Sequence, residues 1–559
     1  MFITKKIEEK VRRVNHRGVL ASSLLGLGFG LLTVLLPNQA QAAEEIAFYY
    51  NPYGQFKIQV KDLEILATED RITKRLDFFT RRLTPEQLGQ LKDVLSRKIE
   101  FNPIAIYKFS NSPIGEIVLK NIGTAIKSDL NLNGFLALRG AILSAAFSDE
   151  GLTMVNMLSR FSHDTIHLDT AVVLRCLEDS STLLQKKESI VANIKRQSQE
   201  SQPQQPSATN STIDPSTSGA LSWKKETIKF RNPKRSRNSV FDLYLPQSDR
   251  QNSQPLPLIV ISHGLASNRT TFAYLGEHLA SQGFAVAIPE HIGTNSEQFQ
   301  AILSSLAKPP KASNLVNRPG DIKYVLDTLE QNPTLNKDLN LEQVGVIGQS
   351  FGGYTALAVG GAKYNREKLK QDCDGNQHDN VFFNMSALIQ CRVNELPDQA
   401  YRLRDERVQA ILAMNPLNSK VFGKKGIAQI QIPTMILSGT DDLITPTVQE
   451  QIYPFAWLAS PQKYLVLAEK GTHFSFLDKG KGVLPIPSEF IGPDPELTFP
   501  VIKALSTAFF KTHISDRPEY GAYLNNSYLK SLNSNPFEFS LIKTLSETQL
   551  EKEYSRTSR

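Results

Sequence analysis

The sequence predicts an α/β protein in which a small all-α domain precedes a mostly parallel, eight-stranded sheet flanked by helices. Three observations predict this fold class. Residues 43–197 repeat apolar positions at helical spacing with few strand signals, and residues 198–219 are rich in Gln, Ser, Pro and Thr. Beyond residue 219, short apolar segments alternate with helical patterns, which is typical of a parallel sheet covered on both faces. The 559 residues suffice for two or three domains.

Residues 1–42 have the features of a signal peptide. A basic start precedes an apolar run from Gly18 to Leu36, and Ala40-Gln41-Ala42 then supplies the small residues that a signal peptidase recognises. We therefore predict export to the periplasm or out of the cell. The alternative is an uncleaved membrane anchor, because the apolar run is close to the roughly 20 residues that span a bilayer.

The charge of the chain argues against a nucleic-acid partner. The formal charge is +7, and it falls to +3 when residues 1–42, with six Lys/Arg against two Glu, are removed. No obvious block of Lys and Arg interleaved with aromatic residues remains to bind phosphates.

Residues 43–197 are predicted to form the all-α domain. Thr84 followed by Pro85 marks a helix start, residues 134–147 have the pattern of a buried helix, and residues 171–196 end as an amphipathic one. His163 and His167 have no partners at metal-ligand spacing, so we assign them structural roles and predict no metal site. Residues 198–219 are predicted to be a flexible linker.

Residues 220–515 form the second predicted domain, and its strands are short apolar segments. They cover residues 227–230, 240–245, 258–262, 284–289, 344–347, 408–414, 434–438 and 464–467. Helical patterns over 271–282, 321–330, 351–362 and 499–513 separate the later strands. The tail at 516–559 is weakly patterned, and no element is predicted there.

A long polar insertion at residues 363–404 contains two of the three cysteines. Cys373 and Cys391 are a candidate disulfide in an oxidising compartment, with Cys176 left over; the alternative is three free thiols. The insertion follows the helix after Ser350, where it is placed to form a cap over a site. The alternative, which the sequence supports equally, is a surface loop that makes no contact with the site.

The strongest chemical motif is Gly348-Gln349-Ser350-Phe351-Gly352. It follows the apolar strand segment LEQVGVIG and precedes the small-residue helical run GGYTALAVGGA. A sharp strand-to-helix turn of this kind exposes a serine hydroxyl at a helix N-terminus. We predict that Ser350 is a nucleophile.

A serine hydroxyl needs a base to take its proton, and His473 is the predicted base. It follows the last predicted strand, YLVLAE, in a loop at the sheet edge. His378 and His513 fit this role less well. A third member must orient the imidazole, and Asp441 and Asp442 both follow the predicted strand at residues 434–438, between Ser350 and His473 in the chain.

Two backbone N–H groups are predicted to bind a developing oxyanion. Phe351, directly after the nucleophile, supplies one, and Leu265, in the loop after the strand LPLIVIS, supplies the other. His263 is expected to pack beneath that loop. Arg318 and Asp321, which open a helix, are predicted to hold the segment after His291.

With these residues placed, residues 222–513 resemble the platelet-activating-factor acetylhydrolase and dienelactone hydrolase branches of the α/β-hydrolase superfamily. Residues 43–197 resemble the helical domain of unknown function found ahead of such hydrolases in cyanobacteria. The motifs that carry the resemblance to the two branches are His263-Gly264-Leu265, Pro289-Glu290-His291, Gly348-Gln349-Ser350-Phe351-Gly352-Gly353 and Gly471-Thr472-His473-Phe474.

The resemblance selects Asp442 over Asp441, because G-x-x-D-x-x-x-P is the spacing of this loop in many related hydrolases. It also implies the α/β-hydrolase fold. One departure weakens the acetyl-phospholipid substrate: acetylhydrolases of this branch carry the acid after the preceding strand, where this chain has Met414-Asn415-Pro416.

Together these patterns predict a serine esterase that acts on short-chain or lipid esters through an acyl-enzyme, without metal or organic cofactor. Its partners are then small-molecule or lipid esters, with transient contact at a membrane surface. The alternatives are a transacylase or peptidase with the same triad, and a catalytically silent binding protein on a hydrolase scaffold.

Overall fold

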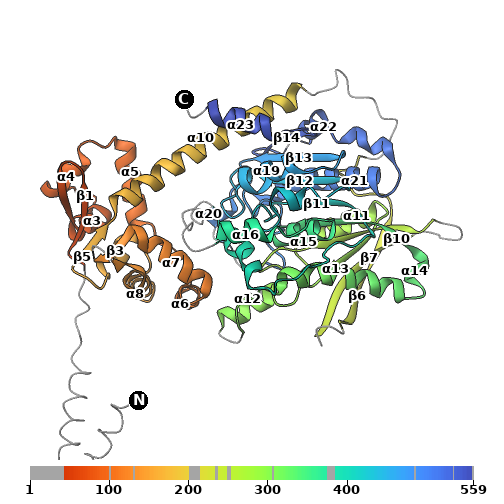
Figure 1. Ribbon diagram of the computed structural model, residues 1–559, viewed down its shortest axis with the longest axis horizontal. Coiled ribbons are helices and arrows are strands. Elements are labelled where there is room, and N and C mark those ends of the chain that lie inside the picture. Colours follow the sequence, from red (N-terminus) through yellow and green to blue (C-terminus); the bar gives the residue numbers. More distant parts are fainter. Residues whose placement is uncertain are drawn as a thin grey trace, which may run out of the picture. The chain divides into compact units, whose positions relative to one another are not determined.

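The computed structural model describes residues 43–99, 102–129, 132–200, 214–232, 237–247, 254–304, 307–373, 384–483, 486, 488–532 and 534–556. The chain divides into two compact units (Figure 1). The first comprises the residues up to Ile106 together with Ile122–Thr170, and the second comprises Tyr107–Asn121 with Ala171–Arg559. The predicted signal peptide lies outside the described residues.

The first unit contains a sheet, so the prediction of an all-α domain is wrong. Its described strands run in the order β2-β1-β5-β3-β4, with β1 parallel to β5 and the other pairs antiparallel. They are β1 (Glu45–Tyr50), β2 (Gly54–Gln59), β3 (Ile126–Asp129), β4 (Leu132–Asn133) and β5 (Thr165–Leu168). Strands of two to six residues give too short a pattern to be separated from the helical periodicity around them.

The three helices predicted within residues 43–197, after Thr84, at 134–147 and at 171–196, are present. Thr84 caps its helix through a capping box with Gln87, in which each side chain bonds the other residue's backbone N–H. The helices here are α3 (Val60–Glu69), α4 (Lys74–Thr80), α5 (Pro85–Ser96), α6 (Pro103–Ser110), α7 (Pro113–Ala125), α8 (Phe135–Ala146), α9 (Met154–Ser159) and α10 (Thr170–Glu200).

The second unit is built on a sheet that is mostly parallel, as predicted, but has nine described strands instead of eight. Their order is β14-β13-β12-β11-β10-β8-β9-β7-β6, and only β6, β7 and β14 run antiparallel to their neighbours. The strands are β6 (Ser222–Asn232), β7 (Arg237–Gln247), β8 (Leu256–Ser262), β9 (Ala285–Pro289), β10 (Leu339–Gln349), β11 (Val408–Met414), β12 (Thr434–Gly439), β13 (Lys463–Glu469) and β14 (Glu538–Ile542).

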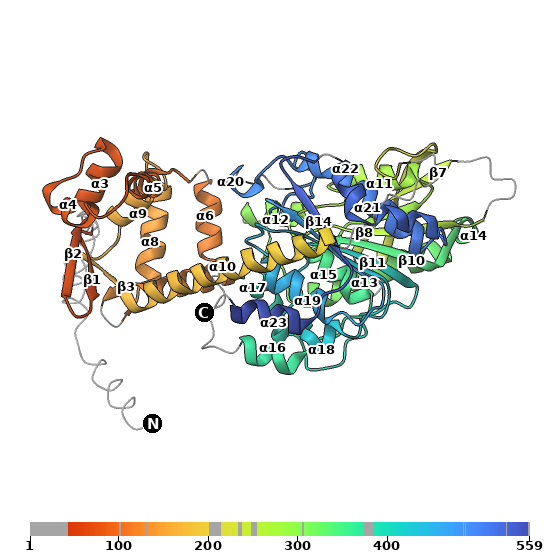
Figure 2. The ribbon, with the colours of Figure 1, turned by 90° about the horizontal axis from the view of Figure 1, so that it is seen from above.

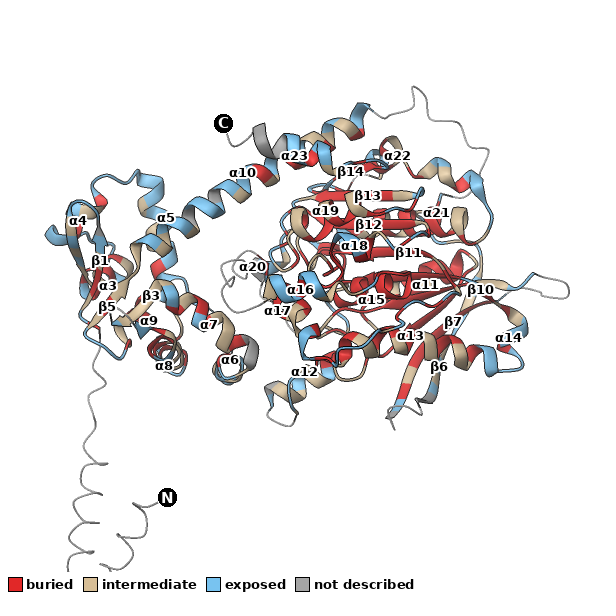
Figure 3. Cartoon of the chain, in the orientation of Figure 1, coloured by how far each residue is buried: buried red, intermediate tan, exposed pale blue. Residues whose placement is uncertain are grey.

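Helices cover both faces of this sheet, and the central strands are almost wholly buried (Figure 3). Helices α13 (Asn314–Gln331) and α15 (Phe351–Val359) contribute to the apolar core on one face. Helices α11 (Ala273–Ser281) and α21 (Phe499–His513) contribute to the other. Because β8 and β10 to β13 are parallel, the loops that follow them meet at one edge of the sheet, where α/β proteins bind their ligands.

The C-terminal tail completes the second unit. Strand β14 pairs with β13, and the tail also contains 3₁₀ helix η5 (Pro518–Tyr523), α22 (Asn526–Ser531) and α23 (Glu547–Arg556). Helix α10 bonds to the same region, since Lys195 Nζ lies 2.6 Å from Glu538 Oε2 and 2.9 Å from Glu469 Oε1. Residues 198–200, where the predicted linker begins, form the last residues of α10. Residues 201–213 of the predicted linker lie outside the described residues.

Within the described ranges, no helix has the length and apolar character needed to cross a membrane. The apolar run at residues 18–36 is not among these ranges.

His278 on α11 is buried between two other segments, and this predicts acid sensitivity. Its Nε2 donates to Pro215 O at 3.1 Å and lies 3.0 Å from Thr507 Oγ1, while Nδ1 is buried without a partner among the described residues. Burial therefore lowers the pKa of His278 to about 4. A histidine whose pKa is lower in the folded protein than in the unfolded chain stabilises the folded state when it is neutral. This contribution is fully present above about pH 6.5 and is lost as the pH falls towards 4.

Replacing His278 with glutamine should reduce this loss. Between pH 7.5 and pH 4.5 we expect the free energy of unfolding of the second unit to fall by about 2–3 kcal/mol less in the variant than in the wild type. Urea unfolding at the two pH values measures the difference. Equal losses in both proteins would contradict the buried, neutral state of His278.

Candidate active site

Ser350 lies in a sharp turn between β10 and α15. Its φ of 56° is in the left-handed region, and the residue is buried, with 7% of its surface exposed. The flanking glycines are required by close contacts: a Cβ on Gly348 would lie 2.0 Å from Gly352 O, and one on Gly352 would lie 1.9 Å from Ser262 O. This is the strained strand-to-helix turn that the sequence motif predicts.

His473 lies between Ser350 and Asp442. Its Nε2 is 2.9 Å from Ser350 Oγ, and its Nδ1 is 2.7 Å from Asp442 Oδ2. All three residues are buried. An imidazole in this position can accept the serine proton through Nε2 while Nδ1–H donates to the carboxylate.

The Asp442 carboxylate is held by its own loop. Oδ1 accepts the N–H groups of Ile444 at 2.8 Å and Thr445 at 2.7 Å, and Oδ2 accepts the Thr445 hydroxyl at 2.7 Å. These three hydrogen bonds fix the direction of the carboxylate. Asp441 instead points to solvent, where it is half exposed and lies 2.9 Å from Lys187 Nζ of α10.

Asn415 follows β11, at the position where the acetylhydrolases that this chain resembles carry their acid. Its amide is fully buried and joins the loops that follow β12 and β13. Oδ1 accepts from Gly439 N at 2.9 Å, and Nδ2 donates to the carbonyl oxygens of Thr472 at 3.2 Å and His473 at 3.3 Å. A carboxylate could not make the last two bonds, because it has no proton to donate. Asn415 therefore braces the loop that carries His473.

The two predicted oxyanion donors belong to two segments close to Ser350. Phe351 is the first residue of α15, so its N–H is one that an α-helix leaves without an internal partner. Leu265 lies in the loop after β8, and a Cβ on the preceding Gly264 would be 3.4 Å from Ser350 Cβ. Ala266 N donates to Thr294 O at 2.9 Å and fixes the far side of this loop.

Arg318 on α13 is a fully buried guanidinium beneath both donors. It donates to the His263 carbonyl oxygen and, at 2.8 Å, to Thr294 Oγ1, and its guanidinium carbon lies 4.7 Å from the centre of the Phe351 ring. Burial lowers the pKa of Arg318 to about 9. The sequence predicted that Arg318 would hold the segment after His291. The contacts with the loop after β8 and with Phe351 were not predicted, because they join residues far apart in the chain.

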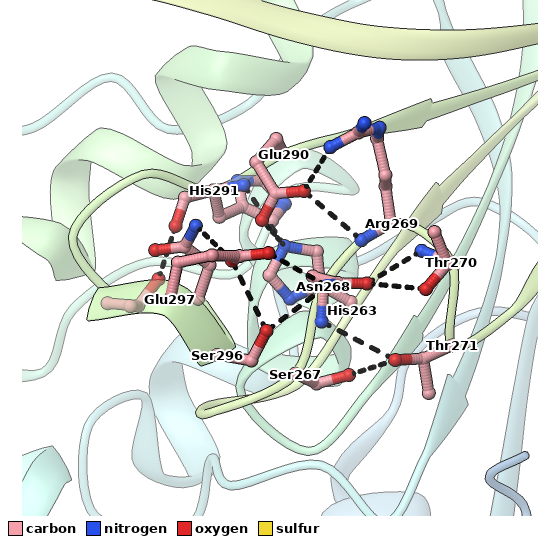
Figure 4. A network of polar contacts seen from close by, with 12 residues as sticks. His263, Ser267, Asn268, Arg269, Thr270, Thr271, Glu290, His291, Ser296 and Glu297 are labelled. Atoms are coloured by element: carbon pink, nitrogen blue, oxygen red, sulfur yellow. Dashed lines mark hydrogen bonds and ion pairs between the residues drawn. The ribbon is translucent and has the colours of Figure 1, made fainter. Parts of the chain in front are cut away.

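His263 packs beneath the loop after β8, as expected (Figure 4). Its Nε2 accepts from His291 N at 3.0 Å, and its Nδ1 lies 2.9 Å from Gly264 O. The imidazole is therefore neutral with the proton on Nδ1. Burial, with the nearby charges of His291 and Arg318, holds the pKa of His263 well below its ordinary value.

Charged side chains extend this network away from Ser350. His291 Nδ1 lies 2.9 Å from Asp321 Oδ2, and its Nε2 lies 2.8 Å from Ser262 Oγ. Glu290 is paired with Arg269 at 2.9 Å, and burial raises the pKa of Glu290 (Figure 4). None of these groups reaches the hydroxyl of Ser350, and we assign them to support of the loop.

The insertion at residues 363–404 touches the loop that carries Asp442. It contains α16 (Arg366–Cys373), α17 (Ala387–Gln390) and 3₁₀ helix η2 (Cys391–Glu395), and a disulfide joins Cys373 to Cys391. Ser386 N donates to Ile444 O at 3.0 Å. The buried Glu450 carboxylate also accepts from Asn384 Nδ2 at 2.6 Å. The described part of the insertion is thus fastened beside the candidate site.

No group of three or more His, Cys, Asp or Glu side chains suited to a metal ion exists among the described residues. His167 lies on β5 and His163 is exposed at a position outside any strand or helix.

Two segments of the chain match family models. Residues 42–169 match "Alpha/beta hydrolase of unknown function (DUF1400)", and residues 243–319 match "Platelet-activating factor acetylhydrolase, isoform II". The second segment includes His263, Leu265 and Arg318, whereas Ser350 lies outside both.

Curated relatives also match parts of the chain. The chloroplastic chlorophyllase-1 proteins of Citrus unshiu and Citrus sinensis are each 29% identical over 103 residues, which cover 18% of this chain and 28% of theirs. The platelet-activating factor acetylhydrolase of Canis lupus familiaris is 32% identical over 148 residues, which cover 20% of this chain and 33% of the relative. The chain thus spans about a third or less of the length of these relatives. The similarity is therefore to an α/β-hydrolase family of unknown function over residues 42–169 and to the platelet-activating factor acetylhydrolase family over residues 243–319.

Proposed function

We propose that this protein is an exported serine esterase in which Ser350, His473 and Asp442 form the catalytic triad. The observation that carries the proposal is the hydrogen-bonded series from Ser350 Oγ through His473 to Asp442 Oδ2, with contacts of 2.9 Å and 2.7 Å. The strained turn at Ser350 gives further support, because it presents the hydroxyl at the N-terminus of α15.

The reaction follows from this geometry. His473 Nε2 takes the proton of Ser350 as Oγ attacks the ester carbonyl carbon, and the N–H groups of Leu265 and Phe351 bind the oxyanion. The tetrahedral intermediate collapses to an acyl-Ser350, and His473 gives its proton to the departing alcohol. Water, deprotonated by His473, then attacks the acyl-enzyme and releases the carboxylic acid.

The substrate class proposed is a short-chain or lipid ester. The relatives are named as an acetylhydrolase and as chlorophyllases, which favours ester hydrolysis over amide hydrolysis. The shared stretches are short, and Asn415 stands where the acetylhydrolase branch carries its acid.

Export is part of the same proposal. The Cys373–Cys391 disulfide supports it, because structural disulfides persist in oxidising compartments. Cell fractionation with a C-terminal epitope tag tests it: the tagged protein is expected outside the cytoplasm, and a purely cytoplasmic protein would contradict export.

The test of the function is fluorophosphonate labelling of the purified protein, together with hydrolysis of p-nitrophenyl esters of graded chain length. We expect covalent labelling and turnover, with a chain-length optimum that defines the acyl pocket. A folded protein that neither labels nor turns over any ester would contradict the proposal and favour a binding protein on a hydrolase scaffold.

Arg318 should act as a positioning residue in this reaction. Replacing it with methionine removes the donor to His263 O and the cation against Phe351, so both oxyanion donors lose support. We expect kcat to fall by about 10- to 100-fold with little change in KM, because the lost alignment matters most in the transition state. The free energy of unfolding should also fall, by about 1–3 kcal/mol, since the His263 carbonyl loses its donor.

Arg407→Met is the matched control. Arg407 pairs with Asp405, Asp327 and Glu330 and makes no hydrogen bond to the loop after β8. This variant should lose stability while keeping its kcat. An Arg318→Met enzyme with unchanged kcat would limit Arg318 to a role in folding.

A further inference from the structure

A cavity of about 580 Å³ lies in the second unit, apart from the candidate active site. Its walls come from α16, α18 (Gly423–Ile427), α19 (Tyr453–Trp457) and α23, with Leu183 of α10. Figure 2 shows α16, α18, α19 and α23 gathered on one side of the unit. Neither Ser350, His473 nor Asp442 lines it. The volume is within the range of about 300–1,000 Å³ that small-molecule sites occupy.

The lining has an excess of positive charge. Four lysines face two carboxylates; they are Lys368, Lys420, Lys424 and Lys425 against Asp372 and Glu547. Lys368 forms a close ion pair with Asp372, from which Lys420 Nζ is 4.0 Å away. Lys424 pairs closely with Glu547. Lys425 Nζ lies 4.0 Å from Glu367 Oε2, which does not line the cavity. With Glu367 included, four lysines face three carboxylates, so the charge around the cavity remains positive.

The inner wall is aromatic. The rings of Tyr453 and Trp457 lie 6.0 Å apart, and both residues are half buried. Trp457 Nε1 donates to Glu547 Oε1 at 3.3 Å, which fixes the indole against the cavity. Aromatic faces beside a group of cations suit a ligand that has an apolar body and one charged end.

We propose that this cavity binds an amphipathic organic anion, with its carboxylate or phosphate head against Lys420 and Lys424 and its apolar body against Trp457. Charge complementarity selects the head group, and the aromatic wall selects the body. The proposal does not depend on ester hydrolysis, because no residue of the proposed triad takes part.

Tryptophan fluorescence can report this binding directly. The chain has two tryptophans, and Trp223→Phe removes the one on β6, so that Trp457 alone emits. Titration of this variant with decanoate, and separately with decyl phosphate, is expected to give a saturable change in emission. The neutral 1-decanol should bind at least about tenfold more weakly, because it lacks the charge. Equilibrium dialysis with labelled decanoate checks that the change reflects one bound molecule.

One variant expected to weaken binding and one expected to tighten it distinguish a direct effect on the ligand from a general loss of structure. In the Trp223→Phe background, replacing Lys420 and Lys424 together with methionine should weaken decanoate binding by about tenfold or more. Glu547→Gln should tighten it, because it removes a competing carboxylate but keeps an acceptor for Trp457. Lys337→Met, an exposed lysine on α14 (Leu335–Asp338), should change nothing.

The outcomes are distinct. Preferential binding of decanoate or of decyl phosphate identifies the head group. Dialysis that finds no bound decanoate, or equal affinity for decanoate and 1-decanol in all variants, would overturn the proposal. Neither result would bear on Ser350, whose labelling is measured separately.

Discussion

Replacing Ser350 with alanine is expected to abolish fluorophosphonate labelling and to lower kcat on p-nitrophenyl esters by about 10⁶-fold. Loss of the serine from a Ser-His-Asp triad costs about this much, because no other group can form the acyl-enzyme. Residual hydrolysis would come only from the oxyanion donors and from substrate binding. Active-site titration with the phosphonate and steady-state kinetics measure the two effects on the same preparation.

The alanine variant should remain folded. Alanine has the same left-handed φ cost as serine at this turn, so the strain at 56° is unchanged. Urea unfolding is expected to agree with the wild type within about 1 kcal/mol. Ser531→Ala, an exposed serine on α22, is the matched control and should label fully. A Ser350→Ala protein that still labels at one site would show that another residue is the nucleophile.

The local part of the site could be predicted from the sequence. The turn at Ser350 depends on a contiguous motif, since Gly348 and Gly352 must lack side chains for strand and helix to approach. His473 follows a strand whose apolar run is clear in the sequence. At both positions, a single contiguous segment of the chain determines the local structure.

The parts of the site that could not be predicted depend on contacts between residues that are far apart in the chain. Arg318 lies 55 positions from His263 in the chain, and its carbonyl partner carries no sequence signal. Asn415 is similar, because its role depends on loops after two other strands. A buried polar network of this kind is defined only when the strands are already assembled.

Some strands were not predicted from the sequence for the same reason. Strand β14 is five residues long in a weakly patterned tail, and it gains its hydrogen bonds only by pairing with β13. Strands β3 and β4 are shorter still and form part of a sheet whose members are distant in sequence. Tertiary pairing, not local propensity, stabilises such short strands.

Asp441 and Asp442 offer a comparison between neighbours, and we expect opposite results from their asparagine variants. Asp442→Asn should lower kcat by about 10⁴-fold, whereas Asp441→Asn should leave kcat unchanged within about twofold. Asp441 is half exposed and pairs only with Lys187 among the described residues, so its loss removes a surface ion pair. Steady-state kinetics on the two variants, prepared in parallel, measure the contrast.

The large effect at Asp442 follows from how its carboxylate is held. Oδ1 accepts two backbone N–H groups, so an asparagine at this position must turn its carbonyl oxygen towards Ile444 and Thr445. Its NH₂ group then faces His473 Nδ1, which can accept from it only if the imidazole proton moves to Nε2. A protonated Nε2 cannot take the proton of Ser350, so the base is lost although the site keeps its shape. If instead Asp441→Asn were the inactive variant, the acid would have been assigned to the wrong neighbour, and the 2.7 Å contact between His473 and Asp442 would have no catalytic role.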